Sequence, residues 1–539
     1  MKMKLLDLRQ AVLLLACSVS TRAVESVVDI GYSKYRGRVV GDGTTQWLGM
    51  RFAAPPVGNL RFAAPQDPIA TTGILDASKF GPICYASDPT DWTNKPSKRF
   101  TISEDCLYLN VFAPSDATTG SKLPVMFFIQ GGGFNSNSNN NFNGSDIVRE
   151  GNITVVSINY RVGPYGFLQS QEVLEDASLN NGVRDMIKAL KWVGENIKHF
   201  GGNPKQVIIN GDSAGAAAIA ILLTSPATRT SDLFVGSIAE STPENNFRTL
   251  ERGQKQYSCL LQAAGCTNST SSLACLRSLN VTALQTTTCS FGPGEDTDIS
   301  PNSSFAAFEA GEYLHVPTIW GSTADEGTKS APESIDTAVQ ANALLSKSAP
   351  FSNNSLELLD QLYIYKNETV FPNAGRKWRN AANYVGDAQF HCPTRVYQNI
   401  LLKDGVPTWN YHYKVEDPEQ EAEGIGAYHT VELNAVWGPN NTDGNPPKSY
   451  YTTNAPVVPL VRSYWTSFVK HLDPNKERLE GAPVWKQWDE ERARIRFRTN
   501  DTAMEAMSQS QNNKCEILDP LVRALDKALP DGELIELHL

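Results

Sequence analysis

The residues from 211 to 215 have the types and spacing of a nucleophilic serine on a tight turn. They read Gly211-Asp212-Ser213-Ala214-Gly215, with one glycine two positions before the serine and one two positions after it. A Gly-x-Ser-x-Gly turn exposes the serine hydroxyl, which can then attack a carbonyl carbon in acyl transfer. The five residues alone are weak evidence, because glycine-rich chains contain the pattern by chance.

The segments on either side of Ser213 are those that such a turn requires. The apolar run 206–210 predicts a buried strand before the turn, and the alanine-rich run 216–223 predicts a helix after it. The order strand, turn, helix favours a nucleophile elbow over an ordinary glycine-rich turn.

A second glycine-rich segment supplies the other requirement of acyl transfer, which is a set of donors for the tetrahedral oxyanion. Gly131, Gly132 and Gly133 follow an apolar run, 125–129, that predicts a strand. A lone glycine triplet is usually only a loop, but this one follows its own strand and precedes an elbow. We therefore expect the N–H groups of Gly132, Gly133 and Ala214 to form the oxyanion hole.

The elements that must position these residues alternate along the chain. Apolar runs without polar alternation predict buried strands at 125–129, 153–158, 206–210 and 234–239, and apolar spacing predicts a helix over 182–199. Strands that alternate with helices predict an α/β fold, with a mostly parallel sheet and helices on both faces. Beyond about residue 330 the pattern weakens and no clear linker is visible. We therefore expect one catalytic domain over residues 24–539.

Composition limits the classes of partner. The chain has 539 residues, of which 41% are hydrophobic and 20% charged, and its net charge is −10. It has no cluster of Lys and Arg, so we expect no nucleic-acid partner. The mild acidity bears mainly on solubility.

The N-terminus has the pattern of a secretory signal. Lys2, Lys4 and Arg9 precede the apolar run 11–17, and small residues lead to Ala23. The run is shorter than the ~20 residues that span a bilayer, and no later run is long enough. We expect a signal peptide over residues 1–23, a secreted protein and no membrane span.

Cysteines and glycosylation sequons agree with export. Without Cys17 an even set of eight cysteines remains, which predicts disulfides in an oxidising compartment, and their spacing does not suit zinc. Asn-x-Ser/Thr sequons predict glycosylation at Asn143, Asn152, Asn268, Asn280, Asn302, Asn353, Asn367, Asn440 and Asn500.

Several further segments, taken in order, resemble the type-B carboxylesterase/lipase family, which includes cholinesterases and secreted fungal esterases and lipases. The matching segments are 52–62 (FAAPPVGNLRF), 103–111 (SEDCLYLNV), 159–164 (NYRVGP) and 200–204 (FGGNP). The resemblance implies the α/β-hydrolase fold, a large mostly parallel central sheet flanked by helices. It also implies the chain order Ser, acid, His for the catalytic residues.

The resemblance places the remaining catalytic residues. Segment 316–327 resembles the family's acid segment, which makes Glu326 the expected acid and leaves Asp325 as its competitor. Segment 426–433 resembles the family's His segment and makes His429 the base. His429 would take the proton of Ser213, and Glu326 would orient the imidazole. This chemistry needs no metal or cofactor, and its substrate is a small-molecule ester.

The resemblance also suggests disulfide pairs. The pairs are Cys84–Cys106, Cys266–Cys275 and Cys392–Cys515, which leave Cys259 and Cys289 as the fourth. The loop between Cys84 and Cys106 is short, polar and interrupted by proline. It lacks the amphipathic lid of interfacial lipases, which favours short-chain soluble esters.

Departures from the family pattern bear on selectivity. Gln130 stands where many relatives have His, Asp212 where Glu is usual, and Met186 where Gln is common. Trp92 resembles the choline-binding Trp of cholinesterases, although its spacing differs.

Two alternatives to the esterase interpretation remain. One is a triacylglycerol lipase. The other is a catalytically silent, cholinesterase-like binding protein, although such proteins lack the nucleophile.

Overall fold

The computed structural model describes residues 23–95, 100–137, 141–244, 247–367, 369–442, 445–527 and 534–538. The predicted signal peptide, apart from Ala23, lies outside these residues. The backbone of Trp92 belongs to a 3₁₀ turn, η2 (Trp92–Asn94), but its side chain is outside the described part.

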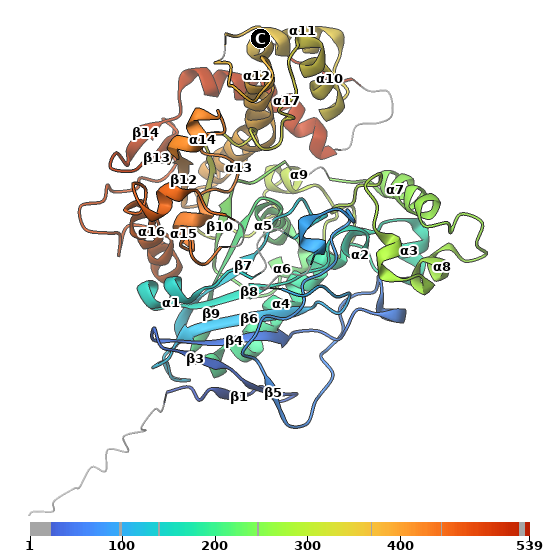
Figure 1. Ribbon diagram of the computed structural model, residues 1–539, viewed down its shortest axis with the longest axis vertical. Helices are drawn as coiled ribbons and strands as arrows, with labels where there is room; N and C mark the ends of the chain where they lie inside the picture. Colours follow the sequence, from blue (N-terminus) through green and yellow to red (C-terminus); the bar gives the residue numbers. More distant parts are fainter. Residues whose placement is uncertain are drawn as a thin grey trace, which may run out of the picture.

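An eleven-stranded sheet forms the centre of the molecule, in the order β14-β13-β12-β11-β10-β9-β7-β8-β6-β4-β3 (Figure 1). Its strands are β3 (Arg38–Val40), β4 (Thr44–Arg51), β6 (Tyr108–Pro114), β7 (Leu123–Ile129), β8 (Thr154–Ile158), β9 (Gly202–Asp212), β10 (Gly236–Glu240), β11 (Thr318–Thr323), β12 (Thr408–Tyr413), β13 (Ala493–Phe497) and β14 (Ala503–Ala506). The seven neighbouring strands β13, β12, β11, β10, β9, β7 and β8 pair in parallel. The outer strands β14, β6, β4 and β3 pair antiparallel with their neighbours. The mostly parallel sheet expected from the sequence is therefore confirmed.

A second, three-stranded sheet contains β1 (Val27–Asp29), β2 (Lys34–Arg36) and β5 (Ile74–Asp76). Figure 1 shows it below the edge strands β3 and β4, far from the C-terminal helices.

The apolar runs form strands because the central sheet is buried on both faces. Along β7, Val125, Phe127 and Ile129 belong to one core, whereas Met126 and Phe128 belong to the other. A strand covered on both sides has no position for a solvent-facing residue, which explains the absence of polar alternation.

Helices cover the two faces. The helices are α1 (Ser145–Gly151), α2 (Gly163–Phe167), α3 (Gln171–Asp176), α4 (Asn181–Asn196), α5 (Ala214–Thr224), α6 (Pro226–Arg229), α7 (Leu250–Ala263), α8 (Ser272–Ser278), α9 (Ser304–Glu309), α10 (Ala338–Ser348), α11 (Asn353–Leu359), α12 (Trp378–Gly386), α13 (Cys392–Lys403), α14 (Pro418–Ala422), α15 (Leu433–Val436), α16 (Val457–His471) and α17 (Gln509–Lys527). Apolar residues of α4 and α5 join the first core, and those of α1, α15 and α16 join the second. In Figure 1, α10, α11, α12 and α17 gather at the end of the molecule farthest from β1 and β5.

The helix expected over 182–199 ends slightly early. α4 stops at Asn196 and a 3₁₀ turn, η3 (Ile197–Phe200), continues it. Gly201 then adopts φ 86°, a left-handed conformation that glycine enters without steric cost, and the chain turns into β9.

Four disulfides join the cysteines, three in the pairs that the family resemblance suggested and the fourth between the two cysteines that remained. They are Cys84–Cys106, Cys259–Cys289, Cys266–Cys275 and Cys392–Cys515. The Cys259–Cys289 bridge ties α7 to the loop that follows residue 289, and the Cys392–Cys515 bridge ties α13 to α17.

Candidate active site

Ser213 occupies a strained turn between β9 and α5. Its backbone has φ 53° and ψ −124°, which a non-glycine residue adopts only when its surroundings impose it. The two flanking glycines leave the required space. A Cβ on Gly215 would lie 2.1 Å from the carbonyl oxygen of Ile129, and one on Gly211 would lie 2.7 Å from the backbone of Gly215. The turn therefore depends on glycine at both positions.

Ser213, His429 and Glu326 form one hydrogen-bonded row. Nε2 of His429 lies 2.8 Å from Oγ of Ser213, and Nδ1 of His429 lies 2.5 Å from Oε2 of Glu326. The second carboxylate oxygen of Glu326 accepts from the backbone N–H of Thr323 at 2.7 Å. The three residues follow three different strands, β9, β11 and β12, whose carboxyl ends meet at one edge of the sheet.

The charges of Glu326 and His429 influence each other. Burial alone would raise the pKa of Glu326 and lower the pKa of His429, because it penalises both charges. Mutual attraction and the hydrogen bond outweigh burial in both groups. The pKa of Glu326 is therefore lowered from its ordinary value and that of His429 is raised. The lowered pKa keeps Glu326 a carboxylate near neutral pH, and its charge stabilises the imidazolium that forms when His429 takes up a proton.

Asp325, the competing acid, points away from the row. It pairs with Arg379 and accepts the backbone N–H of Ala427 at 2.8 Å. Glu326, not Asp325, contacts His429.

The glycine-rich loop after β7 lies against the elbow. Gly132 and Gly133 adopt φ 109° and 60°, and a Cβ on Gly132 would lie 2.2 Å from the carbonyl oxygen of Ser136. The N–H of Gly131 donates to Asp212 at 3.0 Å, which joins the loop to the elbow. The N–H groups of Gly132 and Gly133 donate to no backbone or side-chain acceptor within the described ranges. They are free for an incoming anion.

A profile described as the carboxylesterase family matches residues 24–518. The chain belongs to the carboxylesterase family. Membership supports a carboxylic ester hydrolase, and it confirms the resemblance that the sequence motifs indicated.

Three proteins similar to this chain are 31% to 34% identical to it over the aligned residues. Para-nitrobenzyl esterase of Bacillus subtilis is 31% identical over 502 residues, covering 86% of this chain and 93% of that protein. Lipase 1 of Geotrichum candidum is also 31% identical, covering 82% of this chain and 85% of that protein. The crystal structure of Aspergillus niger EstA superimposes with a TM-score of 0.87 at 34% identity, covering 93% of this chain and 99% of that chain.

Gln130 links two loops beside the elbow. Its buried side chain donates to Asn137 at 3.1 Å, and Asn137 in turn donates to the backbone oxygen of Cys84 at 2.7 Å. Gln130 therefore helps to join the glycine-rich loop to the Cys84–Cys106 loop.

Two buried carboxyl groups beside the row have no role assigned by the sequence reasoning. Glu432 accepts from Ser241 at 2.9 Å and from Tyr411 at 2.8 Å, and Glu240 accepts from Trp465 at 2.6 Å. Burial, followed by repulsion from Glu326, raises the pKa of Glu432 to about 7. Burial also raises the pKa of Glu240. Glu432 lies three residues after His429, a spacing that could have drawn attention to it.

A cavity of about 200 Å³ lies beside Ser213. Its wall includes Gly133 from the glycine-rich loop, Ala214 from the elbow, Glu244, Arg248 and the loop 290–293. Drug-sized ligands usually occupy about 300–1,000 Å³, so this cavity suits a small group. The sequence reasoning did not single out Arg248.

Proposed function

We propose that the protein is a secreted serine carboxylic ester hydrolase that forms an acyl-enzyme on Ser213, with short-chain soluble esters as substrates. The observation that carries the proposal is the hydrogen-bonded row from Ser213 through His429 to buried Glu326. A serine hydroxyl is a poor nucleophile until a neighbouring base removes its proton, and this row supplies the base and its orienting acid.

The catalytic roles follow from proton positions. Neutral His429 accepts the Ser213 proton through Nε2 as Oγ attacks the ester carbonyl, and Glu326 stabilises the imidazolium that results. The imidazolium then protonates the leaving alcohol. Water, deprotonated by the same imidazole, attacks the acyl-enzyme and releases the acid with Ser213 restored.

The oxyanion of each tetrahedral intermediate binds the backbone N–H groups of Gly132, Gly133 and Ala214. The first two have no acceptor within the part of the chain that the structure describes, and the third is the first residue of α5. N–H groups at the start of a helix have no intrahelical partner, so they point outward to an anion.

Small acyl groups suit the site for two reasons. The cavity beside Ser213 measures about 200 Å³. The described first half of the Cys84–Cys106 loop, residues 84–95, is fixed by hydrogen bonds: Asn94 bonds the backbone of Ala86, and the N–H of Ser87 donates to the backbone oxygen of Asn135 at 2.7 Å. A loop so attached differs from an amphipathic lid that opens at a lipid surface.

Secretion is supported by the N-terminal pattern and by four disulfides, which persist in oxidising compartments. No helix in the described part of the chain is long and apolar enough to cross a membrane. We also propose that residues 24–539 form a single domain.

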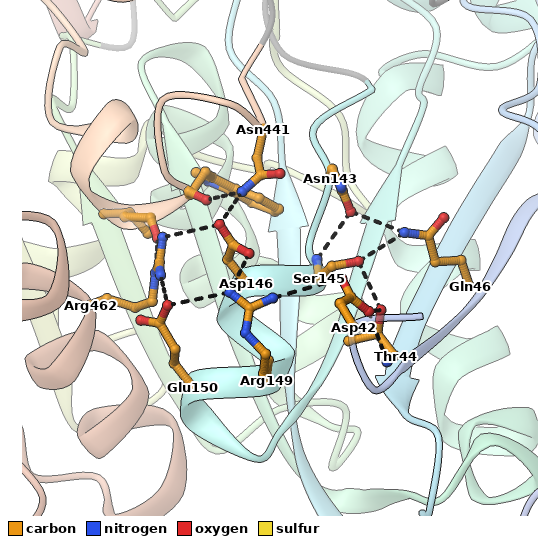
Figure 2. Close-up of polar contacts among 12 residues, drawn as sticks. Asp42, Thr44, Gln46, Asn143, Ser145, Asp146, Arg149, Glu150, Asn441 and Arg462 are labelled. Atoms are coloured by element: carbon orange, nitrogen blue, oxygen red, sulfur yellow. Dashed lines mark hydrogen bonds and ion pairs between the residues drawn. The ribbon is translucent and has the colours of Figure 1, made fainter. Parts of the chain in front are cut away.

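The sequons differ in how accessible their asparagines are. Eight are exposed: Asn152, Asn268, Asn280, Asn302, Asn353, Asn367, Asn440 and Asn500. Asn143 is half-buried, and Figure 2 shows its side chain within a polar network with Gln46 and Ser145. We propose that the exposed group carries the glycans.

Hydrolysis of 4-nitrophenyl esters from acetate to palmitate, by the secreted protein and its Ser213→Ala variant, tests the proposal. Activity on short chains that the variant lacks supports it. Activity that rises toward palmitate and increases above the solubility limit would instead indicate a triacylglycerol lipase. No turnover, together with no labelling of Ser213 by an organophosphonate, would contradict the esterase proposal and favour a binding protein.

A further inference from the structure

The cavity beside Ser213 contains one cationic residue. Arg248 lines it together with Gly133 and Ala214, two of the proposed oxyanion donors. A group bound to the guanidinium and an ester carbonyl at Ser213 would therefore share one space of about 200 Å³. Nothing in the proposed hydrolytic mechanism uses this positive charge.

The guanidinium has neutral partners only. Arg248 donates through Nη1 to the backbone oxygen of Ser290 and through Nη2 to Oγ of Ser290, the second bond measuring 3.0 Å. Its Nε is buried and has no hydrogen-bond partner. Burial, followed by repulsion from Arg252, lowers the pKa of Arg248 to about 10, so the side chain remains charged at neutral pH.

No carboxylate among the described residues forms an ion pair with Arg248. Glu244 is the one carboxylate that lines the same cavity, and it contributes no ion pair to the guanidinium. Arg248 is half-buried, and its bonds to Ser290 lie at an exposed site, so the guanidinium is accessible from the cavity. A guanidinium also has donors arranged to bind both oxygens of one carboxylate. An anion that enters the cavity would therefore meet a guanidinium with no carboxylate bound to it.

The wall that carries Ser290 is held in place, which fixes the position of the guanidinium. Asn135 donates to the oxygen of Phe291 at 2.6 Å and accepts its N–H at 3.0 Å, so the wall is joined to the glycine-rich loop. The Cys259–Cys289 disulfide joins the same wall to α7. A cation held in a rigid wall loses little entropy when it binds a ligand.

We propose that Arg248 binds a carboxylate of the substrate, so that the preferred ester carries an anionic group close to its scissile carbonyl. The inference rests on the proposed esterase function, and it narrows the substrate class. The anionic group can belong to the acyl part or to the alcohol part, and both place the same chemistry in the cavity.

Two pairs of esters distinguish an anionic acyl group from an anionic alcohol group. Monomethyl glutarate against methyl valerate tests an anionic acyl group, and O-acetylglycolate against propyl acetate tests an anionic alcohol. Hydrolysis is followed in a pH-stat for the wild type, Arg248→Gln, Arg248→Lys and Arg252→Gln. Arg252 is exposed, lies four positions further along in α7 and does not line the cavity, so it is a matched control.

For each pair, the measured quantity is kcat/KM for the anionic ester divided by kcat/KM for the neutral ester. We expect Arg248→Gln to lower this ratio by roughly 10- to 100-fold in one of the two pairs, which is the effect of losing hydrogen bonds to a charged group. Arg248→Lys keeps part of the ratio and Arg252→Gln keeps all of it. An unchanged ratio in both pairs, or an equal fall in Arg252→Gln, would overturn the inference.

A binding measurement separates failure of this inference from failure of the esterase proposal. If neither these esters nor the 4-nitrophenyl esters are hydrolysed and Ser213 is not labelled, the esterase proposal fails. The Ser213→Ala protein is then titrated calorimetrically with glutarate and with glycolate. Binding that Arg248→Gln abolishes supports the anion site, and absence of binding overturns it.

Discussion

Nδ1 of His429 lies 2.5 Å from Oε2 of Glu326, and the Glu326 side chain is fully buried. This contact orients the imidazole so that its other nitrogen faces Ser213. Because a buried carboxylate favours a positive neighbour, the contact also raises the pKa of His429. One hydrogen bond thus affects both the geometry and the proton affinity of the proposed base.

Replacing Glu326 by Gln should lower kcat for a short-chain ester by about 10,000-fold, the scale seen when a triad acid becomes an amide. The amide presents the wrong hydrogen-bond pattern to the imidazole and removes its counter-charge. Steady-state kinetics with 4-nitrophenyl butyrate measure the loss. A kcat close to that of the wild type would show that Glu326 is not the acid.

The pH dependence of kcat/KM should report the pKa of His429. The base works only when neutral, and its pKa is raised above 6.5, so activity should fall as the pH drops through that raised value. In Glu326→Gln the pKa of His429 falls, and the acidic limb of the residual activity should move to lower pH. An acidic limb at the same pH in both proteins would contradict the coupling.

Asp325→Asn provides the matched control for the acid. Asp325 neutralises Arg379 and accepts the N–H of Ala427, but it does not contact His429. The substitution should therefore lower stability by about 1–2 kcal/mol, as when one partner of a partly buried polar contact is removed, with little loss of kcat. Urea unfolding and steady-state kinetics on the same sample separate the two effects. A large loss of kcat with unchanged stability would assign the acid to Asp325.

The parts of the site that the sequence predicts are those encoded by neighbouring residues. The elbow and the glycine-rich loop are each contiguous, and β7 and β9 are apolar because both sheet faces are buried. His429 and Glu326 required the family resemblance, because they lie on loops that only the sheet brings together. The choice between Asp325 and Glu326 depends on side-chain direction, which the sequence does not encode locally.

The residues that the sequence did not reveal become distinctive only through their surroundings in the folded protein. Arg248 resembles any other arginine until the cavity around it is visible, and Glu240 resembles any other strand-end acid. The low apolar content of the Cys84–Cys106 loop was visible in the sequence, but its attachment to Asn135 was not.

Gly215→Ala should destabilise the protein or prevent folding. The new Cβ would lie 2.1 Å from the backbone oxygen of Ile129. Its position is fixed by the α-carbon of residue 215, so the contact is relieved only if the backbone of the elbow or of β7 moves. Gly194→Ala is the matched control. This helical glycine in α4 is exposed, and a Cβ at its position would have open space around it. Alanine should therefore raise the free energy of unfolding by about 0.5–1 kcal/mol. Thermal unfolding of both variants provides the comparison. Equal midpoints would show that the elbow tolerates a side chain.

Glu432→Gln should change how stability depends on pH. The pKa of Glu432 is raised to about 7 in the folded protein, so folding binds a proton that the unfolded chain releases at lower pH. Its contribution to stability is complete below the unfolded pKa and is lost as the pH rises through about 7. Gln keeps an oxygen that can accept from Ser241 and Tyr411 but does not ionise.

The unfolding midpoint of the wild type should therefore fall more steeply between pH 5 and pH 8 than that of Glu432→Gln. The difference between the two proteins isolates Glu432, because the raised pKa of His429 acts in the same direction in both. Parallel pH profiles would mean that Glu432 is ionised throughout this range.

Glycan mapping should find Asn143 unmodified while exposed sequons are occupied. Oδ1 of Asn143 accepts from Gln46 at 3.2 Å and from the N–H of Ser145 at 3.1 Å, and Gln46 also donates to Oγ of Ser145 at 2.8 Å (Figure 2). A glycan would be attached to Nδ2 of Asn143, which is half-buried and whose Oδ1 is held by this network, so the amide is poorly presented for modification, and Ser145 belongs to the sequon itself. Release of glycans by an amidase in heavy-oxygen water converts each occupied asparagine to a labelled aspartate, which peptide mass spectrometry locates. A label at residue 143 would show that the network around Gln46 does not exclude a glycan.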